Sequence, residues 1–88
     1  MKTAKQFERY FKGIANHRRI EILLLVAKHE NIFLEGIAKI LNCNIKTISE
    51  HTRKLVQAGL INKKYSGQMV RHSISPYGKK FIEFLKTF

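Results

Sequence analysis

The sequence contains no aspartate and only one cysteine, Cys43, in 88 residues. A lone cysteine cannot form an internal disulfide, which suits a reducing compartment. Ser49 and His51 fall on opposite flanks of a predicted helix, and without aspartate they have no third partner for nucleophilic catalysis. We therefore expect that the protein is not an enzyme and needs no cofactor.

Long apolar runs are also missing, so the chain has no segment that could cross a bilayer. Residues 1–13 lack the continuous apolar segment of a secretory signal, and we expect a cytoplasmic protein. Acidic residues are scarce: 6 glutamates face 17 lysines and arginines, for a formal charge of +11. This excess predicts a polyanionic partner, either nucleic acid or an anionic membrane surface.

Apolar spacing and capping residues predict a single domain over residues 1–88, mainly α (α+β), with five helices and a two-stranded hairpin. Thr3 and Gln6 form a capping box for the first helix, and the almost wholly apolar stretch 20–27 predicts a central helix enclosed on most sides. The predicted helices cover about 3–13, 16–28, 34–41, 44–58 and 75–88; strands are expected at 60–65 and 69–74 around Gly67, with a short edge strand at 32–33.

The fourth predicted helix follows a turn of about three residues, so that it forms a helix-turn-helix with the third. At 100° per residue its apolar side contains Ile45, Ile48, Thr52, Leu55 and Val56. The opposite side is cationic or amide-bearing, and a basic hairpin follows directly. This order favours a recognition helix in the major groove of DNA with the hairpin as a wing, over the alternative of a merely solvated helix.

Residues near the start of this helix are the expected base contacts: Lys46, Thr47 and Glu50. Glu50 can accept from a cytosine amino group or pair with a neighbouring cation, and we favour the pairing. His51 can donate to a phosphate or make a structural hydrogen bond. The expected backbone contacts are Asn44, Ser49, His51, Arg53, Lys54, Lys63, Lys64, Gln68 and Arg71.

The two terminal helices contain more large apolar side chains than a small core can accommodate, which predicts a homodimer interface. A two-fold dimer would place two recognition helices about 34 Å apart, as a palindromic site requires. The interface candidates are Phe7, Tyr10, Phe11, Phe81, Phe84, Leu85 and Phe88.

Over roughly residues 12–75 the chain resembles the winged helix-turn-helix of ArsR-type transcription regulators. The resemblance implies a homodimeric repressor that binds a palindromic operator through a winged helix. The matching residues are Ala15, Asn16, Arg19, Ile22, Leu23, Ile37, Ala38, Leu41, Thr47, Ile48, Ser49, His51, Leu55, Ala58, Gly59, Leu60, Ile61 and Gly67.

Departures from the family pattern remove its usual sensor. Phe33 and Glu35 occupy the positions where metal-sensing members have two cysteines, so we expect no bound metal. Cys43 stands where the family has an apolar residue, which predicts a structural, buried thiol. Thr52 also replaces an apolar residue, and its hydroxyl is expected to bond to the Ile48 carbonyl.

We therefore expect a sequence-specific regulator of double-stranded DNA that acts as a homodimer without a metal. Two alternatives remain at this point. A winged helix can serve as a protein-interaction module with only non-specific DNA binding. A basic amphipathic segment can dock on an anionic membrane, although the core pattern favours a folded domain.

Overall fold

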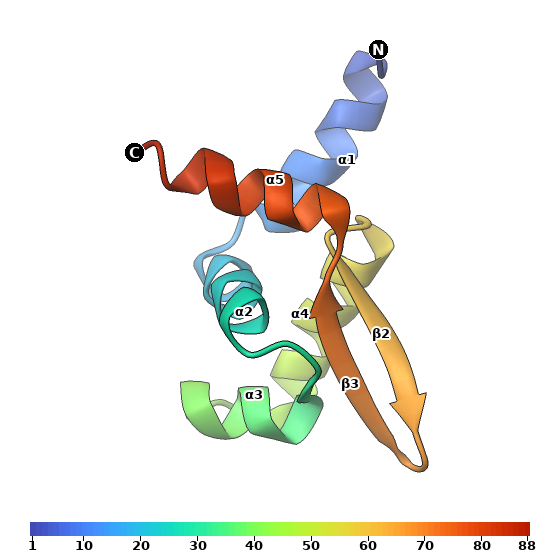
Figure 1. Cartoon of the computed structure of the whole chain (residues 1–88), viewed down its shortest axis with the longest axis vertical. Helices are drawn as coiled ribbons and strands as arrows, with labels where there is room; N and C mark the ends of the chain where they lie inside the picture. Colours follow the sequence, from blue (N-terminus) through green and yellow to red (C-terminus); the bar gives the residue numbers. More distant parts are fainter.

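The computed structural model describes all 88 residues and contains five helices and a three-stranded antiparallel sheet, which confirms the predicted fold (Figure 1). No helix is both long and apolar enough to cross a membrane. In chain order the elements are α1 (Ala4–Ile14), α2 (His17–Lys28), β1 (Ile32–Phe33), α3 (Leu34–Leu41), α4 (Ile45–Gln57), β2 (Ile61–Ser66), β3 (Met69–Ile74) and α5 (Pro76–Leu85).

Side-chain caps fix where four of the five helices begin. Thr3 and Gln6 form the predicted capping box at α1. Asn16, Asn44 and Ser75 accept backbone hydrogen bonds at the starts of α2, α4 and α5. Each such cap contributes about 0.5–2 kcal/mol. The caps were predicted from residue type and position, and all four are confirmed.

The sheet has the strand order β1-β3-β2, and the predicted edge strand at Ile32–Phe33 is confirmed as β1. Ser66 pairs with Met69, which leaves Gly67 and Gln68 as a two-residue turn. Gly67 has φ of +65°, a backbone conformation that glycine adopts without a steric penalty. The hairpin of β2 and β3 runs alongside α4, while α1 and α5 cross at the opposite end, which also carries both termini (Figure 1).

A cluster of 13 buried apolar residues forms the core, and α2 contributes Ile22, Leu23 and Val26, which are fully inaccessible. The expectation that α2 is enclosed on most sides is confirmed, because Ile20, Leu25 and Ala27 are also partly buried against the core. Leu24 is the exception, at 47% exposed.

Helix α5 lies close to Leu60, in the connection between α4 and β2, because Gly78 has no side chain. A Cβ at Gly78 would collide with the Leu60 carbonyl oxygen and lie 2.8 Å from Ile74 Cγ1. Ser75 adds a hydrogen bond from its hydroxyl to the Gly59 carbonyl, at 2.6 Å. The contact between α5 and the core thus has almost no room for a methyl group.

One ionisable side chain, His72 of β3, lies in the interior. It is 3% exposed, and its Nδ1 has no hydrogen-bond partner. Burial lowers the pKa of His72, and a hydrogen bond to the Ile32 backbone opposes this change only in part. The folded protein therefore favours the neutral imidazole.

Replacing Gly78 by alanine should lower the free energy of unfolding by about 1–3 kcal/mol, the usual range for overpacking. This loss exceeds the roughly 1 kcal/mol that alanine gains over glycine in a helix. Urea denaturation measures the change, with Lys80→Ala on the exposed side of α5 as the control. Equal stability of the two variants would contradict the close approach of α5 to Leu60.

Acidification should destabilise the protein through His72. Because its pKa is lowered in the folded state, the unfolded chain binds the proton first as the pH falls. The stability is complete above the unfolded pKa of about 6.5 and decreases as the pH falls through that value. The slope of the free energy of unfolding against pH, measured by urea denaturation at several pH values, should be smaller in His72→Gln than in the wild type. His17→Gln should keep the wild-type slope.

Because the pKa of His51 is lowered as well, some slope should persist in His72→Gln. A slope in His72→Gln identical to that of the wild type would show that burial of this imidazole does not affect stability.

Candidate nucleic-acid interface

A tight turn joins α3 to α4 and fixes the angle between them. Asn42 adopts the left-handed conformation, with φ of 52°, at the end of α3. Cys43 donates from its amide to the Ala38 carbonyl at 3.0 Å and from its thiol to the Leu41 carbonyl at 3.2 Å. Cys43 is half-buried against the core, so its predicted structural role fits, although its burial is incomplete. Asn44 then caps α4.

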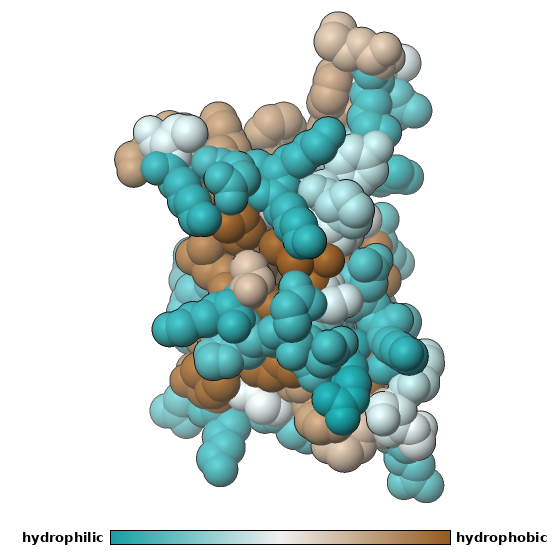
Figure 2. Space-filling view, in the orientation of Figure 1, coloured by the Kyte–Doolittle hydropathy of each residue, from teal (hydrophilic) through white to brown (hydrophobic).

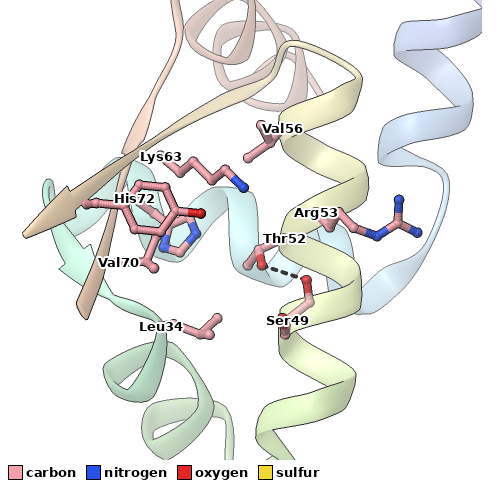
Figure 3. A pocket seen from close by; sticks show the side chains of 9 residues that line it. Leu34, Ser49, Thr52, Arg53, Val56, Lys63, Val70 and His72 are labelled. Atoms are coloured by element: carbon pink, nitrogen blue, oxygen red, sulfur yellow. Dashed lines mark hydrogen bonds between the residues drawn. The ribbon is translucent and has the colours of Figure 1, made fainter. Parts of the chain in front are cut away.

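The inner side of α4 packs on the core. Ile48 and Leu55 are inaccessible and Thr52 is 4% exposed. The Thr52 hydroxyl donates to the Ser49 carbonyl at 2.9 Å, three residues back (Figure 3). The predicted acceptor, the Ile48 carbonyl, is therefore wrong. This hydrogen bond within the helix satisfies the Thr52 hydroxyl, so the side chain can remain buried.

Ile45 departs from the predicted apolar side. It is 44% exposed, whereas the helical wheel grouped it with the buried residues. Ile45 is the first residue of α4, directly after the Asn44 cap. A wheel describes direction around the axis and contains no information about where neighbouring elements end. The exposed start of α4 thus presents an apolar group beside Lys46 and Thr47.

The outward side of α4 is exposed along its whole length, as predicted. Its exposed residues include Lys46, Thr47, Ser49, Glu50, Arg53, Lys54 and Gln57. Asn44 is exposed too, but its Oδ1 accepts from the Lys46 amide at 2.8 Å. The side chains of Lys46 and Thr47 make no hydrogen bond or ion pair within the protein. They are therefore free to contact a ligand.

Glu50 pairs with Arg53, one turn away on the same side of α4. Arg53 Nε donates to Glu50 Oε2 at 3.1 Å, and Arg53 Nη2 donates to the other carboxylate oxygen. The hydrogen bonds from Arg53 lower the pKa of Glu50. The favoured pairing of Glu50 with a neighbouring cation is confirmed. The pair keeps a carboxylate on a cationic surface without leaving it unpartnered.

His51 makes a structural contact. Its Nδ1 lies 3.4 Å from Arg19 Nη1 of α2, and the ring is half-buried. Burial lowers the pKa of His51, and the charges of Arg19 and Lys54 lower it further. A neutral ring can accept a hydrogen bond from Arg19, which holds the guanidinium beside α4.

The register of the hairpin separates the predicted wing contacts into two faces. Lys63 is paired with His72, and both belong to the face that lies against α4. Lys64 and Arg71 are paired with each other and occupy the opposite face. The Arg71 guanidinium lies 4.1 Å from the Phe33 ring centroid and donates to the Asn31 carbonyl at 3.2 Å. Gln68 is exposed at the tip.

A hollow of about 180 Å³ lies between α4 and the wing. Lys63 extends across it toward α4, and His72 lies at its inner end (Figure 3). Val56, Val70 and Leu34 supply its apolar lining. The β2–β3 hairpin and α4 therefore face each other across a hollow that their side chains do not completely fill.

The terminal helices expose several of the predicted interface residues. Phe7 is 39%, Phe11 53%, Phe84 49% and Phe88 90% exposed, and Phe81 and Leu85 are half-buried. Tyr10 is the exception, because it is 7% exposed and belongs to the core of the protomer. On the face drawn in Figure 2, hydrophobic residues of these helices lie at the surface among hydrophilic ones.

A second group of cationic side chains was not predicted from the sequence, because its members lie on three different helices. Arg9 and Lys12 of α1 and Arg19 of α2 line a hollow together with Lys54 of α4. Each was counted in the net charge, but spacing along the chain gives no signal that they converge. No three potential metal ligands among histidine, cysteine, aspartate and glutamate lie together.

Solved structures with the same architecture include proteins described as transcriptional regulators. HlyU from Vibrio cholerae is 25% identical, with a TM-score of 0.84 over 93% of this chain and 89% of that one. A homodimeric winged helix-turn-helix DNA-binding domain of a possible ArsR-family regulator from Mycobacterium bovis is 26% identical, with a TM-score of 0.85 over 94% and 77%. NolR from Sinorhizobium fredii, at 22% identity and a TM-score of 0.85 over 96% and 84%, shows the shared fold alone.

No curated protein matches the sequence. The resemblance to ArsR-type regulators noted from the sequence agrees with these neighbours, whereas the family that matches directly is a different group of winged-helix regulators. Residues 15–67 match the MarR family. Since this segment is more than half of the chain, the protein belongs to the MarR family of winged-helix transcription regulators.

Proposed function

We propose that the protein is a sequence-specific, double-stranded DNA-binding repressor that acts in the cytoplasm as a homodimer on a palindromic operator. The observation that carries this proposal is the outward side of α4. It is exposed from its first turn onward and carries cationic, amide and hydroxyl groups with a single carboxylate, the paired Glu50. Its buried apolar side prevents its rotation. A helix presented in this way can enter the major groove.

Base contacts come from the first turn of α4 in this proposal. Lys46 can donate to guanine, and the Thr47 hydroxyl can contact several bases. Both side chains are unengaged within the protein, so that DNA need not displace an existing bond. Glu50 contacts a cytosine amino group only when Arg53 turns to a phosphate, so its contribution is secondary.

The proposed phosphate contacts surround the base-contacting residues at the start of α4. The contacts come from Ser49, Arg53 and Lys54 on α4 and from Lys63, Lys64, Gln68 and Arg71 on the wing. Asn44 and His51 act mainly by positioning, because Asn44 caps α4 and His51 contacts Arg19. The two faces of the hairpin divide its cations, with Lys63 toward the groove that α4 occupies and Lys64 toward the flanking backbone.

The dimer forms through the terminal helices in this proposal. Exposed phenylalanines at Phe7, Phe11, Phe84 and Phe88 give an apolar surface, and Phe81 and Leu85 continue it inward. The homodimeric state of the Mycobacterium bovis domain supports the same arrangement here. Two-fold symmetry then presents two copies of α4 to successive major grooves about 34 Å apart.

Replacing Lys46 or Thr47 by alanine should change which duplex is preferred, whereas Lys64→Ala should weaken binding to every duplex alike. Loss of a base contact costs about 1–3 kcal/mol of discrimination, which is roughly 5- to 150-fold in relative affinity. Gel-shift titrations on a selected operator and on random DNA measure both effects. If Lys46→Ala weakened both duplexes equally, Lys46 would be a phosphate contact.

The wild-type protein in the same titrations distinguishes a sequence-specific DNA-binding regulator from a protein-interaction module. Weak binding without preference for any duplex would favour a protein-interaction module over a sequence-specific regulator.

Replacing Phe84 by glutamate should shift the protein from dimer to monomer, because a charge would be buried in an apolar interface. Sedimentation velocity measures the change directly. Met69→Glu is the matched control, since Met69 is a comparably exposed apolar residue, at 38%, located at the tip of the wing. An unchanged dimer in Phe84→Glu, or dissociation in both variants alike, would contradict the assignment of the interface to α5.

A further inference from the structure

A concave basic surface lies beside the recognition helix, on the side away from the wing. Its volume is about 340 Å³, and its lining includes Arg9, Lys12, Arg19, Lys54 and Gln57 from three helices. We call it the α1 cleft. All of its charged lining residues are cations, although they come from parts of the sequence as far apart as Arg9 and Lys54.

Close packing of α1 on α4 creates the α1 cleft. A Cβ at Gly13 would collide with the Cβ of Ala58 at the end of α4. The absence of this side chain lets α1 approach α4 closely, and the basic residues on its outer turns then lie near Lys54. The packing of α1 on α4 therefore brings the exposed cations Arg9, Lys12 and Lys54 to the same hollow.

The charges in the α1 cleft are poorly compensated. Its nearest carboxylate contact is Glu8, which lies 3.8 Å from Lys12 in an ion pair whose side chains are 58% and 76% exposed. Pairs this exposed contribute little. Like charges brought together on a concave surface repel each other until an anion binds. The electrostatics of the cleft therefore favour an anionic ligand.

Arg19 is held in place at the inner end of the cleft. Its Nη1 lies 3.4 Å from His51 Nδ1, and its Nη2 donates to the Lys12 carbonyl at 3.4 Å. Its Nε is buried without a partner. The guanidinium thus bridges α1, α2 and α4, and the donors that it can offer a ligand are the remaining N–H groups of Nη1 and Nη2. A fixed guanidinium is well suited to phosphate, which accepts several hydrogen bonds at once.

The cleft and the wing lie on opposite flanks of α4. Ser49, Arg53 and Val56 line the hollow beside the wing, whereas Lys54 and Gln57 line the α1 cleft. A helix in the major groove lies between two phosphate backbones, one along each flank. The wing supplies cations on one flank through Lys63. On the other flank α4 itself contributes only Lys54, and α1 and α2 add Arg9, Lys12 and Arg19.

We propose that the α1 cleft binds backbone phosphate of the duplex on the strand opposite the wing, with Arg9, Lys12, Arg19 and Lys54 as the cationic ligands. This inference rests on the proposed function and extends the DNA contact to the N-terminal helix, to which the sequence assigned only a dimer role. Phe11 and Lys12 are consecutive on α1, so the helix that joins the two protomers also contacts DNA.

The test compares two double variants that lose the same charge. Arg9→Gln/Lys12→Gln removes two exposed cations from the α1 cleft, and Lys28→Gln/Lys79→Gln removes two exposed cations elsewhere. Lys79 lines a separate hollow with Ala27 and Glu30. Affinity for a selected operator duplex is measured by fluorescence anisotropy at a series of salt concentrations, and thermal melting of each variant verifies its folding.

The cleft variant should decrease the salt dependence, expressed as the slope of log affinity against log salt, by about one for each cation that contacts phosphate. Its preference for the operator over random DNA should stay that of the wild type. The control variant should keep the wild-type slope. Equal slopes for the two variants, with a wild type that binds the operator specifically, would overturn the cleft alone. Failure of the wild type to prefer any duplex would overturn the proposed function and the cleft with it.

Discussion

The buried side of α4 is the constraint on which the rest of the molecule depends. Ile48 and Leu55 are inaccessible among core residues from α2 and the sheet, so α4 cannot turn about its axis without exposing them. Exposing two such side chains would cost about 3–6 kcal/mol, which is comparable to the whole stability of a small domain. The cationic side therefore faces outward as a consequence of packing. The capped turn before α4 fixes its start, and Gly59 with φ of +77° ends it before the wing.

Local signals in the sequence were sufficient to predict most of the fold. Thr3, Asn16, Asn44 and Ser75 were recognised as caps because each acts on backbone groups within three residues. Features that depend on distant neighbours could not be predicted. Ile45 and Leu24 are exposed although the apolar pattern grouped them with buried residues, and the α1 cleft exists because three helices meet. The faces of Lys64 and Arg71 follow from the strand register, which a weak alternation of apolar residues did not specify.

Charge and packing serve different purposes in this protein. Cations lie on every helix and on the wing, and α1, α4 and the wing together contain nine lysines and arginines against two glutamates, Glu8 and Glu50. Such a distribution attracts any polyanion, and by itself it supplies affinity without sequence preference. Preference requires polar side chains at fixed positions, and the first turn of α4 provides them next to an exposed Ile45. Arg19 and His51 connect α4 to α2, and Arg19 also donates to the Lys12 carbonyl near the end of α1.

The central claim is that the outward side of α4 distinguishes one duplex sequence from another. The most direct measurement is selection of bound duplexes by the wild-type protein from a random pool, followed by sequencing of the bound fraction. The account predicts enrichment of a palindromic motif whose half-sites are separated by about one helical turn, 10–10.5 base pairs. A bound fraction with the same composition as the starting pool would contradict it.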